Sequence, residues 1–168
     1  VTLIDRGTKV DYGSVLAMLP GVPDGQAGTF DLDLDALDRV LIAAGDRDIR
    51  YYLNGVLFDF TEGHMAGTDG HRLHLYRNRV PKAFKRKVVD GVPQGHPVQM
   101  ILPRGPLRFV VSSGDAVAKM SVWGLGVDKV RPQVLLRMGD AFVWIRKPID
   151  GKYPDVSRVI PSRVNRPV

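Results

Sequence analysis

Residues 29–45, TFDLDLDALDRVLIAAG, open with alternating apolar and polar positions and continue with apolar residues three and four positions apart. Alternation is typical of a strand with one buried face, and the wider spacing is typical of a helix with one buried face. The pattern therefore predicts a strand that changes into a helix near Leu34, with a glycine at the helix end. Asp33 or Asp35 is expected to cap the first helical turn, because a carboxylate there accepts an N–H bond and stabilises the positive end of the helix dipole.

A second apolar stretch, DIRYYLNGVLFDF at 48–60, is rich in β-branched, aromatic and leucine residues. These residue types favour strands. We therefore expect a strand along this stretch, with an interruption or a β-bulge at Asn54 and Gly55.

The segment GTDGHRLHLY contains an Asp-Gly pair, which favours a two-residue hairpin turn of type I′ with positive φ at both central positions. In that register Thr68 faces His71, and Ala66 faces Leu73. Side chains alternate across a strand, so Leu73 and Leu75 are expected on one face. The residues expected on the opposite face are Arg72, His74 and Tyr76.

The second half of the chain predicts a long exposed loop over 77–96, a strand over 97–103 and a short helix that begins after Pro103. Three strands are expected to follow, in AVAKMSVWG, VLLRMGD and AFVWIRK, with a turn between the last two at Gly139 and Asp140. The remaining tail has turn residues at Asp150-Gly151 and is expected to be extended.

These elements amount to two helices and about eight short strands, which predicts an α+β fold with two helices packed on antiparallel sheets in a single domain. A chain of 168 residues is long enough for one such domain with its own core. The expected organisation is a divergent lead or connector at 1–28, the domain at 29–161 and a basic extended tail at 162–168. The order helix, strands, helix, strands also suggests an internal duplication of a strand-to-helix unit.

Composition narrows the classes of function. Lys and Arg number 24 and Asp and Glu number 18, which gives a net charge of +6, and the basic excess favours contact with nucleic acid. The chain has no cysteine, so disulfides and thiolate chemistry are excluded. The sequence shows no apolar run of membrane-spanning length and no secretory signal, and we expect a cytoplasmic protein without a membrane partner.

Two kinds of active site are disfavoured. The candidate metal ligands are His64, His71, His74 and Asp69, but on a hairpin His71 and His74 point to opposite faces, so we expect no metal. A hydrolase arrangement of Asp69 and His71 with Ser112 or Ser113 lacks any feature that fixes these residues together. We therefore expect no enzyme and no cofactor. Tyr51 and Tyr52 are either a stacking surface for nucleic acid or one core and one surface residue.

Four segments, in this order and at these separations, carry a resemblance to a known family: RYYLNGVLFDF, GTDGHRLHLY, ILPRGPLRFV and KPIDGKYPDVSRVIP. Together they closely resemble the middle domain of the bacterial sliding clamp, the DNA polymerase III beta subunit. The resemblance runs from about Thr29 to about Pro161, and its most specific motifs are TDGHRL and DGKYPDVSRVIP.

The resemblance implies the DNA-clamp fold and a processivity role in DNA replication without catalysis. In that family, three such domains in each of two subunits form a ring whose helices face double-stranded DNA, and a cleft beside the middle domain binds short hydrophobic peptides of polymerases, the clamp loader and repair proteins. By motif match, the cleft residues expected here are Leu53, Thr68, Gly70, His71, Arg72, Leu73, Pro154, Arg158 and Val159. The DNA-binding candidates are Arg39, Arg47, Arg50, Tyr51, Arg104 and Arg108.

Two departures from the family leave several functions open. The chain has the length of one domain, and its first helix is more acidic than a surface that faces phosphates should be. One expectation is a fragment or divergent stand-alone clamp homologue that binds clamp-interacting peptides, and another is a domain that assembles into a homohexameric ring on DNA. The alternative is a regulatory decoy that sequesters clamp-binding proteins without encircling DNA.

Overall fold

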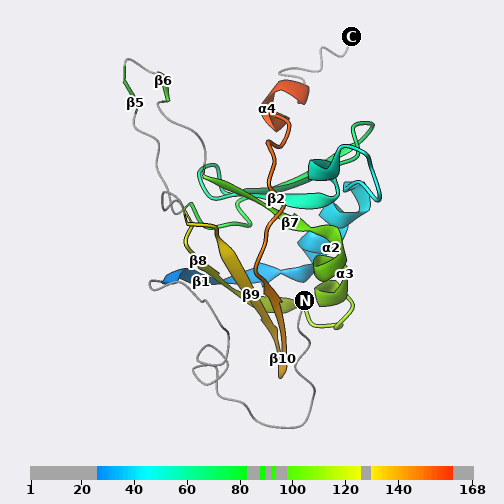
Figure 1. Ribbon diagram of the computed structural model, residues 1–168, viewed down its shortest axis with the longest axis vertical. Helices are drawn as coiled ribbons and strands as arrows, with labels where there is room; N and C mark the ends of the chain where they lie inside the picture. Colours follow the sequence, from blue (N-terminus) through cyan, green and yellow to red (C-terminus); the bar gives the residue numbers. More distant parts are fainter. Residues whose placement is uncertain (1–25, 83–87, 90–91, 94–97, 126–129, 161–168) are drawn as a thin grey trace, which may run out of the picture.

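The computed structural model describes residues 26–82, 88–89, 92–93, 98–125 and 130–160, and within them two four-stranded antiparallel sheets lie against two neighbouring helices (Figure 1). The helices are α2 (Leu34–Ala43), α3 (Arg104–Val111) and the single-turn α4 (Val156–Val159). The strands are β1 (Gln26–Asp33), β2 (Gly55–Asp59), β3 (His64–Thr68), β4 (Leu73–Arg77), β5 (Val88–Val89), β6 (Val92–Pro93), β7 (Gln99–Pro103), β8 (Val117–Trp123), β9 (Gln133–Met138) and β10 (Ala141–Ile145). The α+β fold is confirmed.

The two sheets have equivalent connections. Sheet A has the strand order β1-β8-β9-β10, and sheet B has the order β4-β3-β2-β7. The unit β1–α2 is followed by the three strands β2, β3 and β4, and the unit β7–α3 is followed by β8, β9 and β10. Each unit places its strand in the other sheet, since β1 pairs with β8 and β7 pairs with β2. This arrangement agrees with the internal duplication suggested by the order of elements.

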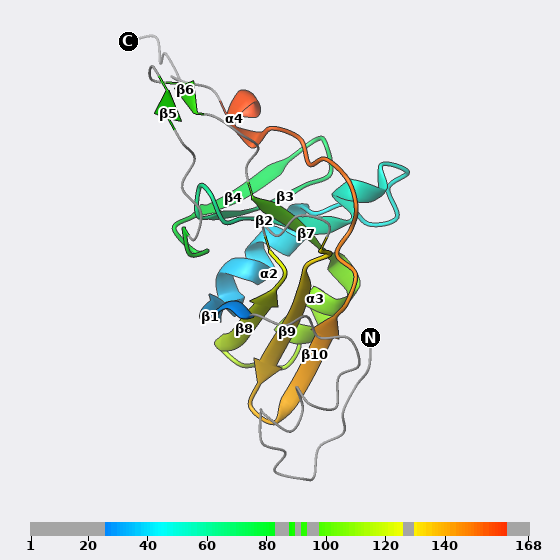
Figure 2. The same ribbon diagram turned by 60° about the vertical axis from the view of Figure 1, so that its left-hand side comes forward.

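The change from strand to helix occurs where the apolar spacing predicts it. Asp33 is the residue before α2, and its carboxylate accepts a hydrogen bond from the backbone N–H of Ala36 at 2.9 Å. The capping prediction is therefore confirmed for Asp33, while Asp35 lies in the first turn. The second helix begins after Pro103, as predicted. In both ribbon views α2 and α3 lie side by side next to the two sheets (Figures 1 and 2).

One core is shared by both sheets. The inner faces of sheets A and B and the buried faces of α2 and α3 contribute to a single apolar cluster, which includes Leu32, Leu37, Phe58, Leu102 and Leu136. A second and smaller cluster, here called the outer cluster, lies on the opposite face of sheet B. It consists of Leu53, Leu57, Ala66, Ile101, Tyr153 and Val156, with Tyr52, Leu73, Leu75 and Ile149 packed at its margin.

The hairpin between β3 and β4 differs from its predicted register. Thr68 pairs with Leu73 and Ala66 pairs with Leu75, so the turn contains four residues rather than two. A type I′ turn needs positive φ at both central residues, but in this loop only Gly70 has a positive φ, of 87°. The Asp69 carboxylate instead accepts the backbone N–H groups two and three residues ahead, which stabilises the wider loop.

The predicted faces of this hairpin are partly confirmed. Leu73 and Leu75 share a face, because both pack against the outer cluster. Tyr76 lies on the opposite side and packs against the main core. Arg72 belongs to the turn and not to β4, so its assignment to a strand face is wrong.

The strand predicted across 48–60 is shorter than expected. Only Gly55–Asp59 is a strand, and Tyr51–Leu53 form a turn of 3₁₀ helix. The Asn54 side chain accepts from the N–H of Asp48 and donates to its carbonyl, both at 2.8 Å, and so closes a loop where the strand was expected.

The final two strands and their turn are confirmed, since Met138 pairs with Ala141 across Gly139 and Asp140. The C-terminal tail, predicted as extended, contains the helical turn α4, because the Asp155 carboxylate accepts the N–H of Ser157. Part of the loop predicted over 77–96 and the terminal segments 1–25 and 161–168 lie outside the described residues, and within that loop β5 pairs with β6.

Candidate peptide cleft and basic surface

The outer cluster brings together parts of the predicted cleft from distant segments. Leu53 is the last residue of the 3₁₀ turn, and its side chain is 1% exposed within the outer cluster. Leu73 is the first residue of β4 and packs at the margin of this cluster. After β10 the chain crosses from sheet A over β7 and β2 of sheet B, and its Tyr153 and Val156 complete the cluster (Figure 1). Two of the apolar cleft candidates therefore lie at the outer cluster, with Leu53 as a buried member and Leu73 as a half-buried one at its margin.

Tyr153 was not among the predicted site residues, yet it connects the crossing segment to the hairpin. Its hydroxyl accepts the backbone N–H of Thr68 at 3.0 Å and donates to the carbonyl of Ala66 at 3.4 Å. Burial raises the pKa of the Tyr153 hydroxyl well above its usual range, so the group stays protonated. The sequence signal that points to it is an aromatic residue between Gly151 and Pro154, and this signal does not specify burial.

Thr68 and Asp69 shape the turn that carries the other predicted cleft residues. The Thr68 hydroxyl donates to the carbonyl of Arg72 at 2.6 Å and accepts the N–H of Gly70 at 3.0 Å. The backbone N–H groups of His71 and Arg72 both donate to Asp69, and these bonds lower the pKa of its carboxyl to about 2. The Arg72 guanidinium also donates to Asp69 at 2.9 Å. The exposed side chains of His71 and Arg72 are thus presented by a preformed turn.

The remaining cleft candidates lie at the surface around α4. Pro154 and Arg158 are exposed, and Val159 is 65% exposed. Arg158 forms an ion pair with Asp155 at 3.3 Å. These residues are exposed, whereas Leu53 and Tyr153 are buried in the outer cluster.

Most of the arginines predicted to contact DNA are occupied by interactions within the chain. Arg39 pairs with Asp35 at 3.1 Å, and Arg108 lies 3.6 Å from Asp38. The Arg104 side chain is half-buried, and its guanidinium donates to the carbonyls of Leu41 and Ala44 at the end of α2, so it caps a helix.

Arg50 has a similar internal role. It pairs with Asp48 at 2.7 Å and donates to the carbonyl of Asp69 at 2.9 Å, which ties the loop before the 3₁₀ turn to the hairpin. A Cβ at position 70 would lie 2.6 Å from the Arg50 guanidinium, but this group is the flexible end of a side chain and can shift. The positive φ of 87° is what favours glycine at this position.

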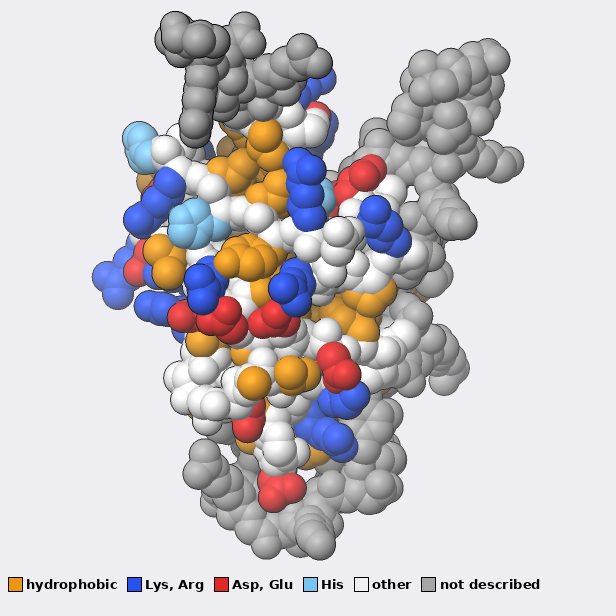
Figure 3. Space-filling view, turned by 180° about the vertical axis from the view of Figure 1, so that it is seen from behind, with side chains coloured by type: hydrophobic (Ala, Val, Ile, Leu, Met, Phe, Trp, Pro, Cys, Tyr) orange, Lys and Arg blue, Asp and Glu red, His pale blue; other side chains and the backbone are white. Residues whose placement is uncertain are grey.

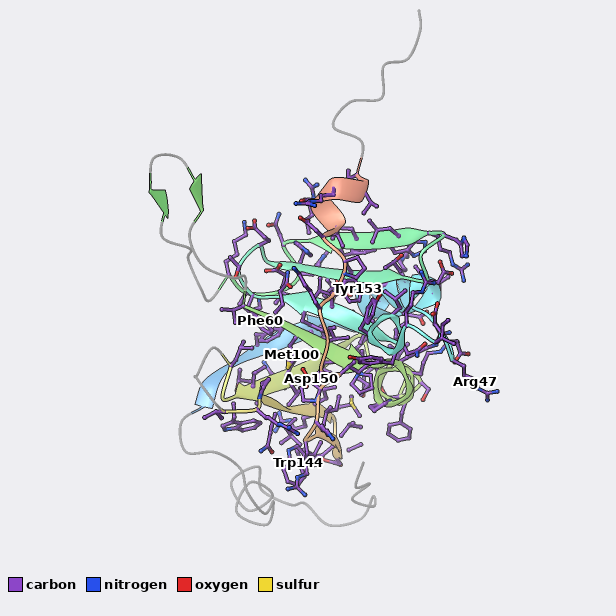
Figure 4. The ribbon with its side chains drawn as sticks, turned by 45° about the horizontal axis from the view of Figure 1, so that its top comes forward. Arg47, Phe60, Met100, Trp144, Asp150 and Tyr153 are labelled. Atoms are coloured by element: carbon purple, nitrogen blue, oxygen red, sulfur yellow. The ribbon has the colours of Figure 1, made fainter. Side chains whose placement is uncertain are left out.

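Arg47 and Tyr51 are the most accessible of the DNA-binding candidates. Arg47 extends away from the body of the domain (Figure 4) and forms no ion pair with another described residue. Tyr51 is 59% exposed, whereas Tyr52 packs against the outer cluster, so the tyrosine pair consists of one surface and one half-buried residue. On the face seen in Figure 3, Lys and Arg side chains are interspersed with Asp and Glu.

A polar pocket of about 340 Å³ joins the two predicted sites. Its walls come from the end of α2, the loop that precedes the 3₁₀ turn, the hairpin turn and the start of α3. The pocket is lined by Ala44, Gly45, Asp46, Asp48, Arg50, Asp69, His71, Arg72 and Arg104. Arginines and carboxylates are therefore present in balanced numbers, and cleft candidates and DNA candidates share one surface.

The histidines considered as metal ligands lie in different surroundings. His71 is in the hairpin turn, and His74 contacts the carbonyl of Arg39 on α2 through Nδ1. His64 lies 4.0 Å from Asp59, and burial lowers the pKa of its ring. Within the described part of the chain no three His, Asp or Glu side chains are grouped as metal ligands would be. Ser112, considered as a nucleophile, donates to the carbonyl of Phe109 in its own helix.

The described helices are all too short, or not apolar enough, to cross a lipid bilayer. No protein-family model matches the chain.

The arrangement of two antiparallel sheets with two adjacent helices is that of a DNA-clamp domain, and solved structures with this fold are similar to the chain. A sliding clamp of Bartonella birtlesii, bound to griselimycin, has a TM-score of 0.58 and 26% identity over 88% of this chain and 38% of the clamp. A Helicobacter pylori beta clamp, bound to a DNA ligase peptide, has a TM-score of 0.61 over 86% of this chain and 38% of the clamp. Its identity of 18% supports the fold alone.

The sequence comparison leads to the same group of proteins. The beta sliding clamp of Vibrio cholerae is 30% identical over 132 residues, which are 77% of this chain and 32% of that protein. The chain is therefore a homologue of bacterial beta sliding clamps, the DNA polymerase III beta subunits, over part of their length. It spans about a third of the length of the curated relatives it matches.

Proposed function

We propose that this chain is the peptide-binding domain of a sliding-clamp-type protein of DNA replication. It binds short apolar peptides of DNA polymerases and of the clamp loader, and it catalyses no reaction itself. The homology to beta sliding clamps supports the class of function. Because the chain spans about a third of those proteins, the proposal covers the part of the activity that one domain carries.

The observation that carries the proposal is the outer cluster, where Leu53 and Leu73 meet the segment that leads to α4. Its half-buried margin offers apolar surface to a ligand. Pro154 and Val159 are exposed apolar residues of the same segment, close in sequence to the cluster residues Tyr153 and Val156. Pockets that bind peptides combine such a surface with a few polar groups that fix orientation. Arg72 and Arg158 supply donors for a peptide carbonyl or carboxylate, and Thr68, Gly70 and His71 shape the turn.

A fluorescently labelled clamp-binding peptide tests this cleft by anisotropy titration. Leu73→Asp and Arg158→Ala are expected to weaken binding at least about tenfold, since they place a charge on the apolar surface or remove a charged donor. Val117→Asp and Arg77→Ala are matched controls, because both residues are exposed and lie outside the cleft. Unchanged affinity in both cleft variants, or equal losses in the controls, would refute the assignment.

We further propose that contact with double-stranded DNA through the candidate arginines is weak in this chain alone. Arg39, Arg50 and Arg108 each lie beside a carboxylate, which offsets their attraction for phosphates. Titration of a labelled duplex at low and moderate salt is expected to show a shallow salt dependence, with Arg47→Ala as the most damaging single change. A steep dependence that needs Arg39 and Arg108 would contradict this.

Ring formation is a separate part of the proposal, because it needs several clamp domains. Light scattering after gel filtration distinguishes a homohexamer from a monomer, and retention on circular but not linear DNA indicates encirclement. A monomer at tens of micromolar excludes a ring built from this chain alone. A decoy that binds the same peptides without encircling DNA is the alternative, and no observation on the described residues favours it over a clamp.

A further inference from the structure

A second pocket, of about 260 Å³, lies where the crossing segment passes the edge of sheet B. Leu57 and Ile101 form its floor, and Ile149 and Tyr153 form its wall. Figure 4 shows Met100, Asp150 and Tyr153, three of the lining residues, near one another at this crossing. None of the nine cleft candidates lines this pocket, although Tyr153 separates it from the hairpin that carries several of them.

The rim of this pocket is basic. Arg131 and Lys147 both line it and are exposed, and Asp150 is the single carboxylate residue among the lining residues described. In the described part of the chain neither Arg131 nor Lys147 forms an ion pair. The lining therefore carries one more positive than negative side chain, and an apolar floor beneath such a rim is complementary to a ligand with an anionic group next to an apolar one.

Backbone groups at the edge of β7 can also form hydrogen bonds with a ligand in this pocket. β7 is an edge strand, and its even-numbered residues pair with β2, as the bond from the N–H of Phe60 to the carbonyl of Val98 shows. The backbone N–H and carbonyl groups of Ile101 therefore point toward the outer edge of β7. Its carbonyl accepts the N–H of Ile149 there at 2.8 Å. Gln99, two residues away, directs its backbone groups to the same edge. Ile101 is already bridged to Ile149, and among the described residues Gln99 has no backbone partner at this edge. A free edge position of this kind binds extended peptide by adding backbone hydrogen bonds.

We propose that this pocket binds a short extended peptide segment in which an acidic residue stands next to an apolar one. The acidic side chain lies against Arg131 and Lys147, the apolar side chain lies on Ile101 and Ile149, and the backbone pairs with Gln99. The pocket volume is below the roughly 300–1,000 Å³ of pockets for drug-sized ligands, so it has room for one such pair of residues and little more. This pocket and the cleft proposed above lie at the same outer cluster, but none of the nine cleft candidates lines the pocket, so variants at those candidates distinguish the two sites.

The test uses a fluorescein-labelled peptide, Gly-Ser-Asp-Leu-Ser-Gly, in anisotropy titrations at low salt. Two matched probes carry Asn in place of Asp or Ala in place of Leu, and both are expected to bind at least about tenfold more weakly. Lys147→Glu and Arg131→Glu are expected to weaken the Asp-Leu probe by a similar factor, and added salt should weaken it further. Lys152→Glu is the matched control, because Lys152 belongs to the same segment but does not line the pocket.

Each further outcome decides between this pocket and the cleft. Arg158→Ala is expected to leave the Asp-Leu probe unaffected, since Arg158 is exposed and neither lines the pocket nor packs on the outer cluster. Loss of binding in Arg158→Ala would place the probe in the cleft and overturn the proposal. Absence of saturable binding, or an equal loss in Lys152→Glu, would overturn it as well. Circular dichroism of each variant establishes that the fold is retained.

Discussion

At the scale of single residues, Tyr153 is the connection on which the candidate cleft depends. Its ring belongs to the outer cluster, and its hydroxyl bonds to the backbone of β3 at Thr68 and Ala66. A side chain from the crossing segment thereby fixes the position of the hairpin strand that presents the turn. The position of this hairpin strand is thus set by a buried hydroxyl as well as by apolar contact.

Tyr153→Phe is expected to lower the free energy of unfolding by about 1–3 kcal/mol, because the buried N–H of Thr68 loses its partner while the aromatic ring remains. Urea denaturation followed by circular dichroism measures the change. Tyr51→Phe is the control and should change stability by less than about 0.5 kcal/mol, since Tyr51 is exposed. An unchanged free energy in Tyr153→Phe would show that the hydroxyl is not required.

Asp69 makes the hairpin turn sensitive to acid. The backbone N–H groups of His71 and Arg72 hold its pKa at about 2, below the ordinary 3.8. A carboxyl whose pKa is lowered in the folded state stabilises the protein above its unfolded pKa, and this contribution is lost as pH falls from about 4 to about 2. Asp69→Asn should therefore have a lower melting temperature than the unaltered protein at pH 7, and the difference should shrink across that window. A difference that does not depend on pH would contradict this origin.

The same residue shows what local sequence does and does not specify. An Asp-Gly pair predicts a turn correctly, because both residues favour turn conformations. The number of residues in the turn depends on side-chain bonds that Thr68 and Asp69 make with backbone groups further along, and the dipeptide alone does not specify them.

The arginines show the same difference between local and distant causes. The ion pair of Arg39 with Asp35 was predictable from their spacing of four residues. The helix-capping role of Arg104 was not, because it depends on the end of α2, which is distant in the sequence.

At the scale of elements, the end of α2 is stabilised by a residue from α3. Arg104 donates to the carbonyls of Leu41 and Ala44, which have no partners within their own helix at its last turn. A cation at this position also interacts favourably with the negative end of the helix dipole. The two helices are thereby joined at one end, next to the polar pocket.

Arg104→Ala is expected to destabilise the protein by about 1–2 kcal/mol, because it removes both hydrogen bonds and the charge at the helix end. Arg108→Ala is the control from the same helix, and its exposed ion pair with Asp38 at 3.6 Å is expected to contribute less than about 0.5 kcal/mol. Thermal denaturation compares the two. Equal effects would mean that Arg104 has no special structural role.

Elements with a clear internal pattern were predictable, and those defined by partners elsewhere were not. The strand-to-helix change at Asp33 follows from residue spacing and a capping side chain. The interruption expected at Asn54 and Gly55 agrees with the start of β2 at Gly55, but the loop and 3₁₀ turn before it were not predictable from composition, because they depend on the bonds between Asn54 and Asp48. Likewise, motifs identify the candidate cleft residues, while the floor of the second pocket depends on how Ile149 meets Ile101.

At the scale of the whole molecule, the exchange of strands between the two sheets makes them interdependent. β1 belongs to sheet A, although in the sequence it precedes α2 and the strands of sheet B. Likewise, β7 belongs to sheet B, although it precedes α3 and the strands of sheet A. Both inner faces also contribute to one core. Neither sheet is complete without the other half of the chain, so we expect the described domain to unfold in a single cooperative transition.

The position of the tryptophans allows a direct test of this interdependence. The chain has two tryptophans, Trp123 and Trp144, and both lie in sheet A, so tryptophan fluorescence reports on that sheet while circular dichroism reports on both. Leu57→Ala removes buried side-chain volume from sheet B and is expected to cost about 2–5 kcal/mol. If the sheets unfold together, the urea midpoint measured by fluorescence falls as far as the midpoint measured by circular dichroism. If the midpoint measured by circular dichroism falls while the midpoint measured by fluorescence stays unchanged, sheet A folds without sheet B. The shared core would then not couple the two sheets.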